Sequence, residues 1–127
     1  MWERYYEPIE SLSSSIYSNL TAEITIDELQ DVIKISSHNK APGPSQISNE
    51  ILRQLLEIAI SSLLNIMNTC LQLENIPKTW LNSNIWPVPK HLHYNNDLSY
   101  TRPITLIKHT RKLFTKILTV HLTTKLV

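Results

Sequence analysis

The chain has 127 residues, a length that suits one domain or part of one. Its single glycine excludes a glycine-rich phosphate loop and a dinucleotide-binding fingerprint, and its single cysteine, Cys70, excludes an intramolecular disulfide. The net charge of +1 hides an asymmetry, because residues 1–75 carry 4 basic and 10 acidic groups whereas residues 76–127 carry 8 basic groups and 1 acid.

This charge split indicates that the carboxy-terminal part faces an anionic partner, such as phosphate. On charge alone, attraction between the two parts within the fold is an equally good explanation. The opening MWERYYEP is acidic and aromatic, unlike a secretory signal, and the longest apolar run, residues 58–67, is too short to cross a bilayer. A lone cysteine fits a reducing compartment. We therefore expect an intracellular protein with no membrane partner, in the nucleus or the cytoplasm.

Residues 1–23 are predicted to form an amino-terminal arm and residues 24–127 a partial domain. The first helix starts after Thr25, which caps it, and Glu28 completes a capping box. Its apolar stripe consists of Ile26, Leu29, Val32, Ile33 and Ile35. The acidic residues of its early turns are predicted to be a solvated face rather than an acid–base or metal cluster.

The segment NKAPGPSQI, residues 39–47, interrupts the helical pattern. Gly43 is predicted to supply a backbone angle that other residues tolerate poorly, between Pro42 and Pro44, which stiffen the corner. Ser48 is the predicted N-cap of the longest helical pattern, which forms one helix or two with a bend near residues 57–62 and is ended by Pro77. Its core pairs are Ile51/Leu52, Leu55/Leu56, Ala59/Ile60, Leu63/Leu64, Met67 and Cys70/Leu71.

The segment WLNSNIWPVPK is predicted to be extended, and its two prolines restrict it to an edge strand or a hairpin arm. RPITLI forms a second short strand after a polar loop. A final amphipathic helix begins near Thr110, with an apolar face of Leu113, Phe114, Ile117, Leu118 and Leu122. The expected fold class is α+β and mostly helical, with packed helices and a short antiparallel β-hairpin, in an incomplete domain.

Patterns typical of enzymes are mostly missing. His91 and His93, with His109 further on, lack a cysteine or carboxylate at ligand spacing, so we interpret them as polar loop histidines rather than a metal site. Cys70 is interpreted as a small buried side chain rather than a nucleophile.

The most specific signal is an ordered series of pieces: KAPGPSQISNEIL, a helix ending NIPKTW, NIWPVPK, TRPITLI and RKLFTKIL. Together, over residues 24–122, they resemble the reverse transcriptases of non-long-terminal-repeat retrotransposons. That family has a K-x-P-G-P-D-G-I corner before a helix that starts with N-E, then a strand ending in P-K, and R-P-I before a basic helix. The resemblance implies a fragment of an RNA-directed DNA polymerase that contains the fingers region, an incomplete domain without palm and thumb.

By position, the resemblance implies that Lys90 and Arg102 contact the phosphates of the incoming nucleotide. Phosphoryl transfer needs cations near the developing charge, which agrees with these residue types. The alternative from the residues alone is a solvated Lys90 and an Arg102 that pairs with Asp97 or caps a carbonyl. The structural motif positions of the family match Pro42, Gly43, Pro44 and Pro103.

Three positions depart from the family pattern, which indicates a divergent copy. Ser45-Gln46 replaces Asp-Gly, His91-Leu92 replaces Pro-Gly, and Thr101 replaces an aromatic residue. The palm aspartates that hold two metal ions lie outside this chain, which has only Asp27, Asp31 and Asp97. We therefore expect no catalytic residue, metal site or cofactor in this chain, although the parent enzyme would use Mg²⁺ through its palm.

Three hypotheses of function follow. The first is a fragment without polymerase activity, whose natural packing partner is the missing palm. The second is a module that binds RNA or DNA through its basic segment 76–127, with stacking aromatics that would otherwise pack on the helices. The third is a helical interaction protein whose apolar helix faces bind a partner protein. Candidate residues of the second hypothesis are Lys108, Arg111 and Lys112, with Trp80, Trp86 and Tyr94 for stacking.

Overall fold

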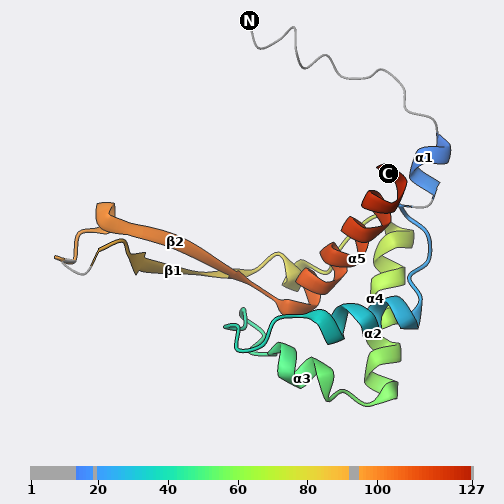
Figure 1. Ribbon diagram of the computed structural model, residues 1–127, viewed down its shortest axis with the longest axis horizontal. Coiled ribbons are helices and arrows are strands. Elements are labelled where there is room, and N and C mark those ends of the chain that lie inside the picture. Colours follow the sequence, from blue (N-terminus) through green and yellow to red (C-terminus); the bar gives the residue numbers. More distant parts are fainter. Residues whose placement is uncertain (1–13, 19, 92–94, 127) are drawn as a thin grey trace, which may run out of the picture.

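The computed structural model describes residues 14–18, 20–91 and 95–126, and most of the predicted amino-terminal arm lies outside these ranges (Figure 1). The helices are α1 (Ser14–Ser18), α2 (Ile26–Ile35), α3 (Asn49–Arg53), α4 (Glu57–Leu73) and α5 (His109–Leu126). The strands are β1 (Ser83–Pro89) and β2 (Thr101–Ile107), and the short 3₁₀ helices are η1 (Lys78–Trp80) and η2 (Leu98–Tyr100). The predicted α+β class, mostly helical with one antiparallel hairpin, is confirmed.

Helix α2 begins as predicted. The Thr25 hydroxyl accepts a hydrogen bond from the Glu28 N–H at 3.3 Å, and the Glu28 carboxylate accepts one from the Thr25 N–H at 2.8 Å. The buried side chains of this helix are Leu29, Val32 and Ile33. Ile26 and Ile35 were predicted for the same stripe but are 38% and 66% exposed. Ile26 lies in the open first turn, and Ile35 is turned away from the core by the helical twist.

The longest helical pattern is two helices, α3 and α4, separated at residues 54–56 just before the predicted bend. The Ser48 hydroxyl caps α3 by accepting a hydrogen bond from the Ile51 N–H at 3.3 Å, as predicted. The buried side chains of these helices include Leu52, Ile60, Leu63, Met67 and Cys70. Ile51 and Leu56 were predicted core members, but they are exposed, because the two helices bury a narrower face than the paired pattern predicts.

Helix α4 ends at Leu73, directly before the segment ENIPKTW that was predicted to end it, but the stop is at Glu74 and not at Pro77. Glu74 adopts a left-handed conformation with φ of 51°, and its N–H donates to the Cys70 carbonyl. Such a residue at the carboxyl end is a common helix stop. Pro77 instead precedes η1, which brings Trp80 into an edge-on contact with Phe114 at a ring-centroid distance of 5.8 Å.

Helix α2 lies at the centre of the helical part and contacts α3, α4 and α5. Asn68 of α4 exchanges two hydrogen bonds with the backbone of Ile24, at 2.8 and 3.0 Å. His121 of α5 contacts the Glu28 carboxylate at 2.8 Å. The buried face of α5 contains Leu113, Phe114 and Ile117, as predicted. Leu122 is 44% exposed, because the last turns of α5 extend beyond the core.

The hairpin of β1 and β2 projects away from the helices (Figure 1). Its strands pair antiparallel, from Ser83 opposite Ile107 to Pro89 opposite Thr101. Pro87 lies opposite Pro103. Hydrogen-bonded and non-hydrogen-bonded pairs alternate, and the Lys90 N–H donates to the Tyr100 carbonyl at 2.8 Å. The two prolines therefore form a non-hydrogen-bonded pair, so neither removes a ladder bond.

No helix within the described ranges combines the length and the apolar character needed to span a bilayer.

Candidate nucleic-acid interface

Lys90 and Arg102 lie near the same end of the projecting hairpin. Arg102 is directly opposite Val88, and Lys90 follows Val88 by two residues. Because directly opposed side chains share a face and side chains alternate along a strand, the register places both cations on one face. Both side chains are exposed. The Lys90 ammonium group donates to the Ser99 carbonyl at 3.2 Å, which holds it at the tip.

Asp97 binds the backbone of Ser99 and not Arg102, the partner considered from the sequence. Its carboxylate accepts a hydrogen bond from the Ser99 N–H at 2.9 Å and caps η2. This backbone hydrogen bond is the main cause that lowers the pKa of Asp97. No ion pair joins Asp97 to Arg102 in the described part of the chain, so the guanidinium of Arg102 is available for an external anion.

One of the three candidate stacking aromatics is accessible in the structure. Trp86 lies opposite Ile104, is 59% exposed, and shares the face of Lys90 and Arg102 by strand alternation. Trp80 is 7% exposed, because it packs in the core against α5. Tyr94 lies outside the described residues. The same face of the hairpin therefore offers two cations together with the candidate stacking residue Trp86.

The Pro42-Gly43-Pro44 corner lies against the joint between β2 and α5. A Cβ atom on Gly43 would lie 2.5 Å from the carbonyl carbon of Ile107 and 2.7 Å from the backbone nitrogen of Lys108. Gly43 has no positive φ, so the prediction of an unusual backbone angle is wrong. Glycine is required because two backbone segments meet there.

Gln46, which follows the corner, is left-handed, with φ of 58°. Its N–H donates to the Gly43 carbonyl at 3.0 Å and closes a turn over Pro44 and Ser45. Gln46 is the position at which the family pattern has glycine. This copy therefore keeps the turn with a residue that is poorly suited to it.

The start of α3 holds the backbone that leads into the corner. The Asn49 side chain donates to the Ser37 carbonyl at 2.8 Å, and the Glu50 carboxylate accepts from the Asn39 N–H at 2.8 Å. The hydrogen bond from Asn39 is the largest cause that lowers the pKa of Glu50. The N-E helix start thus has a structural role here that was not predicted from the sequence.

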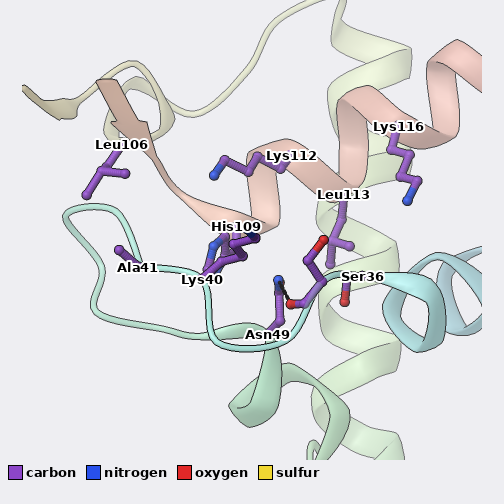
Figure 2. A pocket seen from close by; sticks show the side chains of 10 residues that line it. Ser36, Lys40, Ala41, Asn49, Leu106, His109, Lys112, Leu113 and Lys116 are labelled. Carbon is purple, nitrogen blue, oxygen red and sulfur yellow. Dashed lines mark hydrogen bonds between the residues drawn. The ribbon is translucent and has the colours of Figure 1, made fainter. Parts of the chain in front are cut away.

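A cavity of about 360 Å³ lies between this corner and the first turns of α5 (Figure 2). Its lining includes Lys40, Asn49, Leu106, His109, Lys112 and Lys116. His109 is only 1% exposed, and its Nδ1–H donates to the Ile47 carbonyl at 3.0 Å. Its Nε2 is enclosed and has no partner among the described residues.

The pKa of His109 is lowered, first by burial and also by the charge of Lys112. The Ile47 carbonyl and the charge of Glu50 act in the opposite direction and do not overcome burial. His109 is therefore a neutral ring at physiological pH, with Nε2 as the acceptor nitrogen.

The remaining candidate contacts differ in their availability. Lys108 is half-buried, and Arg111 donates to the Trp80 carbonyl at 3.1 Å, so this guanidinium is engaged within the fold. Lys112 is exposed and lines the cavity. Lys40 and Lys116 also line the cavity and were not predicted as contacts, although the spacing of Lys112 and Lys116 by four residues places them one turn apart on α5.

His93 lies outside the described residues, and no three histidine, cysteine or acidic side chains of the described ranges gather in a way that could hold a metal ion. Cys70 is buried, and burial raises the pKa of its thiol, which agrees with a packing role.

The chain shows sequence similarity to known proteins. No protein-family model matches it. It is 28% identical to a probable RNA-directed DNA polymerase from transposon BS of Drosophila melanogaster, over 91% of this chain and 13% of that protein. It is 27% identical to the RNA-directed DNA polymerase from mobile element jockey and 30% identical to the probable RNA-directed DNA polymerase from transposon X-element, both of Drosophila melanogaster. Each of these two matches covers 75% of this chain and 10% of the relative.

The chain therefore spans about a tenth of the length of the curated relatives it matches. The resemblance given by its ordered motifs is confirmed by these matches. The chain is related in sequence to a segment of the reverse transcriptases of non-long-terminal-repeat retrotransposons.

Proposed function

We propose that this chain forms the fingers segment of a retrotransposon RNA-directed DNA polymerase. In this proposal the hairpin holds Lys90 and Arg102 over the phosphates of the incoming nucleotide, and Trp86 contacts the nucleic acid beside them. The observation that carries the proposal is the placement of both cations on one exposed face of the projecting hairpin. Arg102 supplies a planar fork for phosphate oxygens, and Lys90 supplies a point charge.

The proposal is tested by the salt dependence of binding to a short single-stranded RNA, followed by fluorescence anisotropy. Each phosphate contact contributes about 0.7 to the slope of log affinity against log salt for single strands, so K90Q/R102Q should lower the slope by about 1.4. Lys78→Gln is the matched control, since Lys78 is exposed and lies beyond the opposite end of β1. A double variant with the slope of the control would contradict contact of Lys90 and Arg102 with nucleic-acid phosphates.

We further propose that these 127 residues do not extend a primer by themselves. In the resembled family, the metal-binding aspartates lie in the palm, and the three aspartates of this chain match none of them. Primer extension by the purified chain, with Mg²⁺ present, would contradict this part of the proposal. A mixture with a separately produced palm-containing segment of a relative provides the positive control.

A second candidate function is docking of a partner protein, of which the palm of the polymerase is the first choice. The observation that favours it is the exposure of large apolar side chains of α4, with Ile58 81% and Leu73 70% exposed. Exposed apolar surface of this kind marks interaction sites. Sedimentation of the nucleic-acid-free chain should show self-association that I58E/L73E removes and that the control Ser61→Glu retains. A wild-type chain that stays monomeric at high concentration would count against this candidate.

A further inference from the structure

His121 joins three segments of the chain near the carboxyl end of α5. Its Nε2 lies 2.8 Å from the Glu28 carboxylate of α2, and its Nδ1 lies 3.3 Å from the Leu20 carbonyl of the amino-terminal arm. The side chain of His121 is only 9% exposed. Glu28 and Leu20 are 93 and 101 positions away from His121 in the sequence, so this one ring links the arm, α2 and the last turns of α5.

Both partners of the His121 ring are hydrogen-bond acceptors. The Leu20 carbonyl has no proton to donate. Partial burial raises the pKa of Glu28, but the hydrogen bonds from Thr25 and His121 lower it overall, so this carboxylate is ionised near neutral pH. A neutral imidazole has one N–H and serves one acceptor, whereas the protonated ring has two and serves both. The observed pair of contacts therefore requires the protonated ring.

Loss of the ring proton affects the two contacts unequally. The neutral ring keeps its N–H toward the Glu28 carboxylate, because hydrogen bonds to a charged acceptor are the stronger ones. The lone pair of Nδ1 then faces the Leu20 carbonyl, and this pair of acceptors has no proton between them. Ile24 stays in place, because its backbone exchanges two hydrogen bonds with Asn68 of α4. The change is therefore confined to the part of the arm before Ile24.

Among the charged groups around the ring, Glu28 is the dominant one. It is the only acidic side chain within 4.0 Å of His121 in the described ranges. Helix α4 carries charge only at Glu57, in its first turn. The charged residues nearest in sequence on the other packed segments are Glu23 on the arm, Asp27 and Asp31 on α2, and Lys116 and Lys125 on α5. The three acidic ones are exposed, so solvent and salt screen their effect on the ring.

We propose that His121 is a pH-sensitive latch, which holds the arm at Leu20 when its ring is protonated and releases Leu20 when the ring is neutral. Histidine is the side chain that changes its charge near physiological pH. Because only the protonated ring makes both contacts, the latch closes as the pH falls and opens as the pH rises. The latch does not rest on the proposed contacts of the hairpin, since its three residues lie on the arm, α2 and α5.

The test follows the full chain by NMR from about pH 5.5 to about pH 8.5. The side-chain ¹⁵N resonances of His121 should show two protonated nitrogens at the acidic end, and the carbonyl ¹³C resonance of Leu20 should move with the same midpoint. The order of the Ser18 and Leu20 amides, from ¹⁵N relaxation, should fall over the same range. The ratio of latched to released arm should decrease about tenfold or more across the titration, because the lost hydrogen bond has a charged donor.

Two variants of His121 separate the latch from simple packing. His121→Gln has a single donor nitrogen and cannot serve both acceptors, so Leu20 should be released at both ends of the pH range. His121→Lys has a charge that persists through the range and three donors, so Leu20 should stay held at the alkaline end. His38→Gln is the matched control, because His38 is exposed and the substitution should leave the titration of Leu20 unchanged.

Three outcomes overturn the proposal. The first is a His121 ring with one protonated nitrogen throughout the range, and the second is an order of the Leu20 amide that does not follow the titration of the ring. The third is a titration of Leu20 in His121→Gln that equals the wild type. If His121→Gln does not fold, the wild-type titration and His121→Lys decide the question, since a lysine variant that loses Leu20 at alkaline pH also contradicts the latch.

Discussion

Gly43 touches the carboxyl end of β2 backbone to backbone, since a Cβ atom on Gly43 would meet the carbonyl carbon of Ile107 at 2.5 Å. This contact joins the corner after α2 to the point at which the hairpin becomes α5. The corner therefore sets the base of the hairpin and one wall of the cavity beside His109. The Pro42-Gly43-Pro44 motif, which the sequence indicates only as a turn, therefore lets two backbone segments approach closely in the fold.

Gly43→Ala is expected to destabilise the chain by about 1–3 kcal/mol, the usual cost of overpacking a close contact. The added methyl group meets backbone atoms of Ile107 and Lys108, which cannot move aside as a flexible side chain would. Urea unfolding measures the effect, with the exposed Ala41→Ser as a control that should change stability little. A variant as stable as the wild type would show that the corner is not held against β2.

Gln46→Gly is expected to stabilise the chain by about 0.5–1 kcal/mol, because a residue with a Cβ atom is strained in the left-handed region. The φ of Gln46 is 58°, and its side chain is exposed. Ser45→Gly, at a position without a positive φ, should be neutral or destabilising in the same urea series. Equal effects of the two substitutions would argue against strain at Gln46.

Local patterns predicted much of this fold because their causes are local. The capping box of Thr25 and Glu28 depends on residues three apart, and the two strands follow from residues held extended before prolines. The stop of α4 at Glu74 has no such local signal, because the left-handed position is not a glycine and Pro77 lies three residues further on. The break at residues 54–56 has no local signal either.

The candidate site divides in the same way. Lys90 and Arg102 were chosen by position in ordered motifs, and their shared face follows from strand register. The cavity depends on tertiary contacts between residues far apart in sequence, such as His109 with Ile47. No pattern within one segment predicts that His109 is 1% exposed, since the residue begins a helix that is otherwise basic and polar at its start.

Glu28 is expected to make the stability of the chain sensitive to acid. Partial burial raises its pKa, but hydrogen bonds from the Thr25 backbone and from His121, and the charge of His121, outweigh this and lower the pKa overall. A group with a depressed folded-state pKa stabilises the fold above its unfolded pKa of about 4.3 and loses that contribution as the pH falls through the folded value. Glu28→Gln should therefore destabilise the chain near neutral pH by about 0.2–1 kcal/mol, because glutamine keeps the capping oxygen but loses the charged contact with His121.

The measurement is the difference in urea-unfolding free energy between wild type and Glu28→Gln, taken near pH 7 and again near pH 3. The difference should shrink at the lower pH, because the wild-type carboxylate is then protonated as well. Glu50 and Asp97 also have lowered pKa values, so the comparison of the two proteins, rather than the wild-type curve alone, isolates Glu28. The exposed Glu23→Gln serves as the control. A difference that grows on acidification would contradict the assignment.

His109 is expected to impose a second loss of stability at a higher pH. Burial lowers its pKa, and Lys112 lowers it further, while the Ile47 carbonyl and Glu50 raise it only in part. The unfolded chain therefore binds the proton more readily than the folded chain, so stability falls as the pH decreases from about 6.5 toward the folded-state value and levels off below that value. Urea unfolding between pH 7.5 and 5, with a side-chain ¹⁵N titration of His109, measures both ends of the window. His38→Gln is the control because His38 is exposed on the corner and contacts Glu50 at 3.8 Å. If His38→Gln removes the pH dependence of the unfolding free energy and His109→Gln does not, the buried ring of His109 is not its cause.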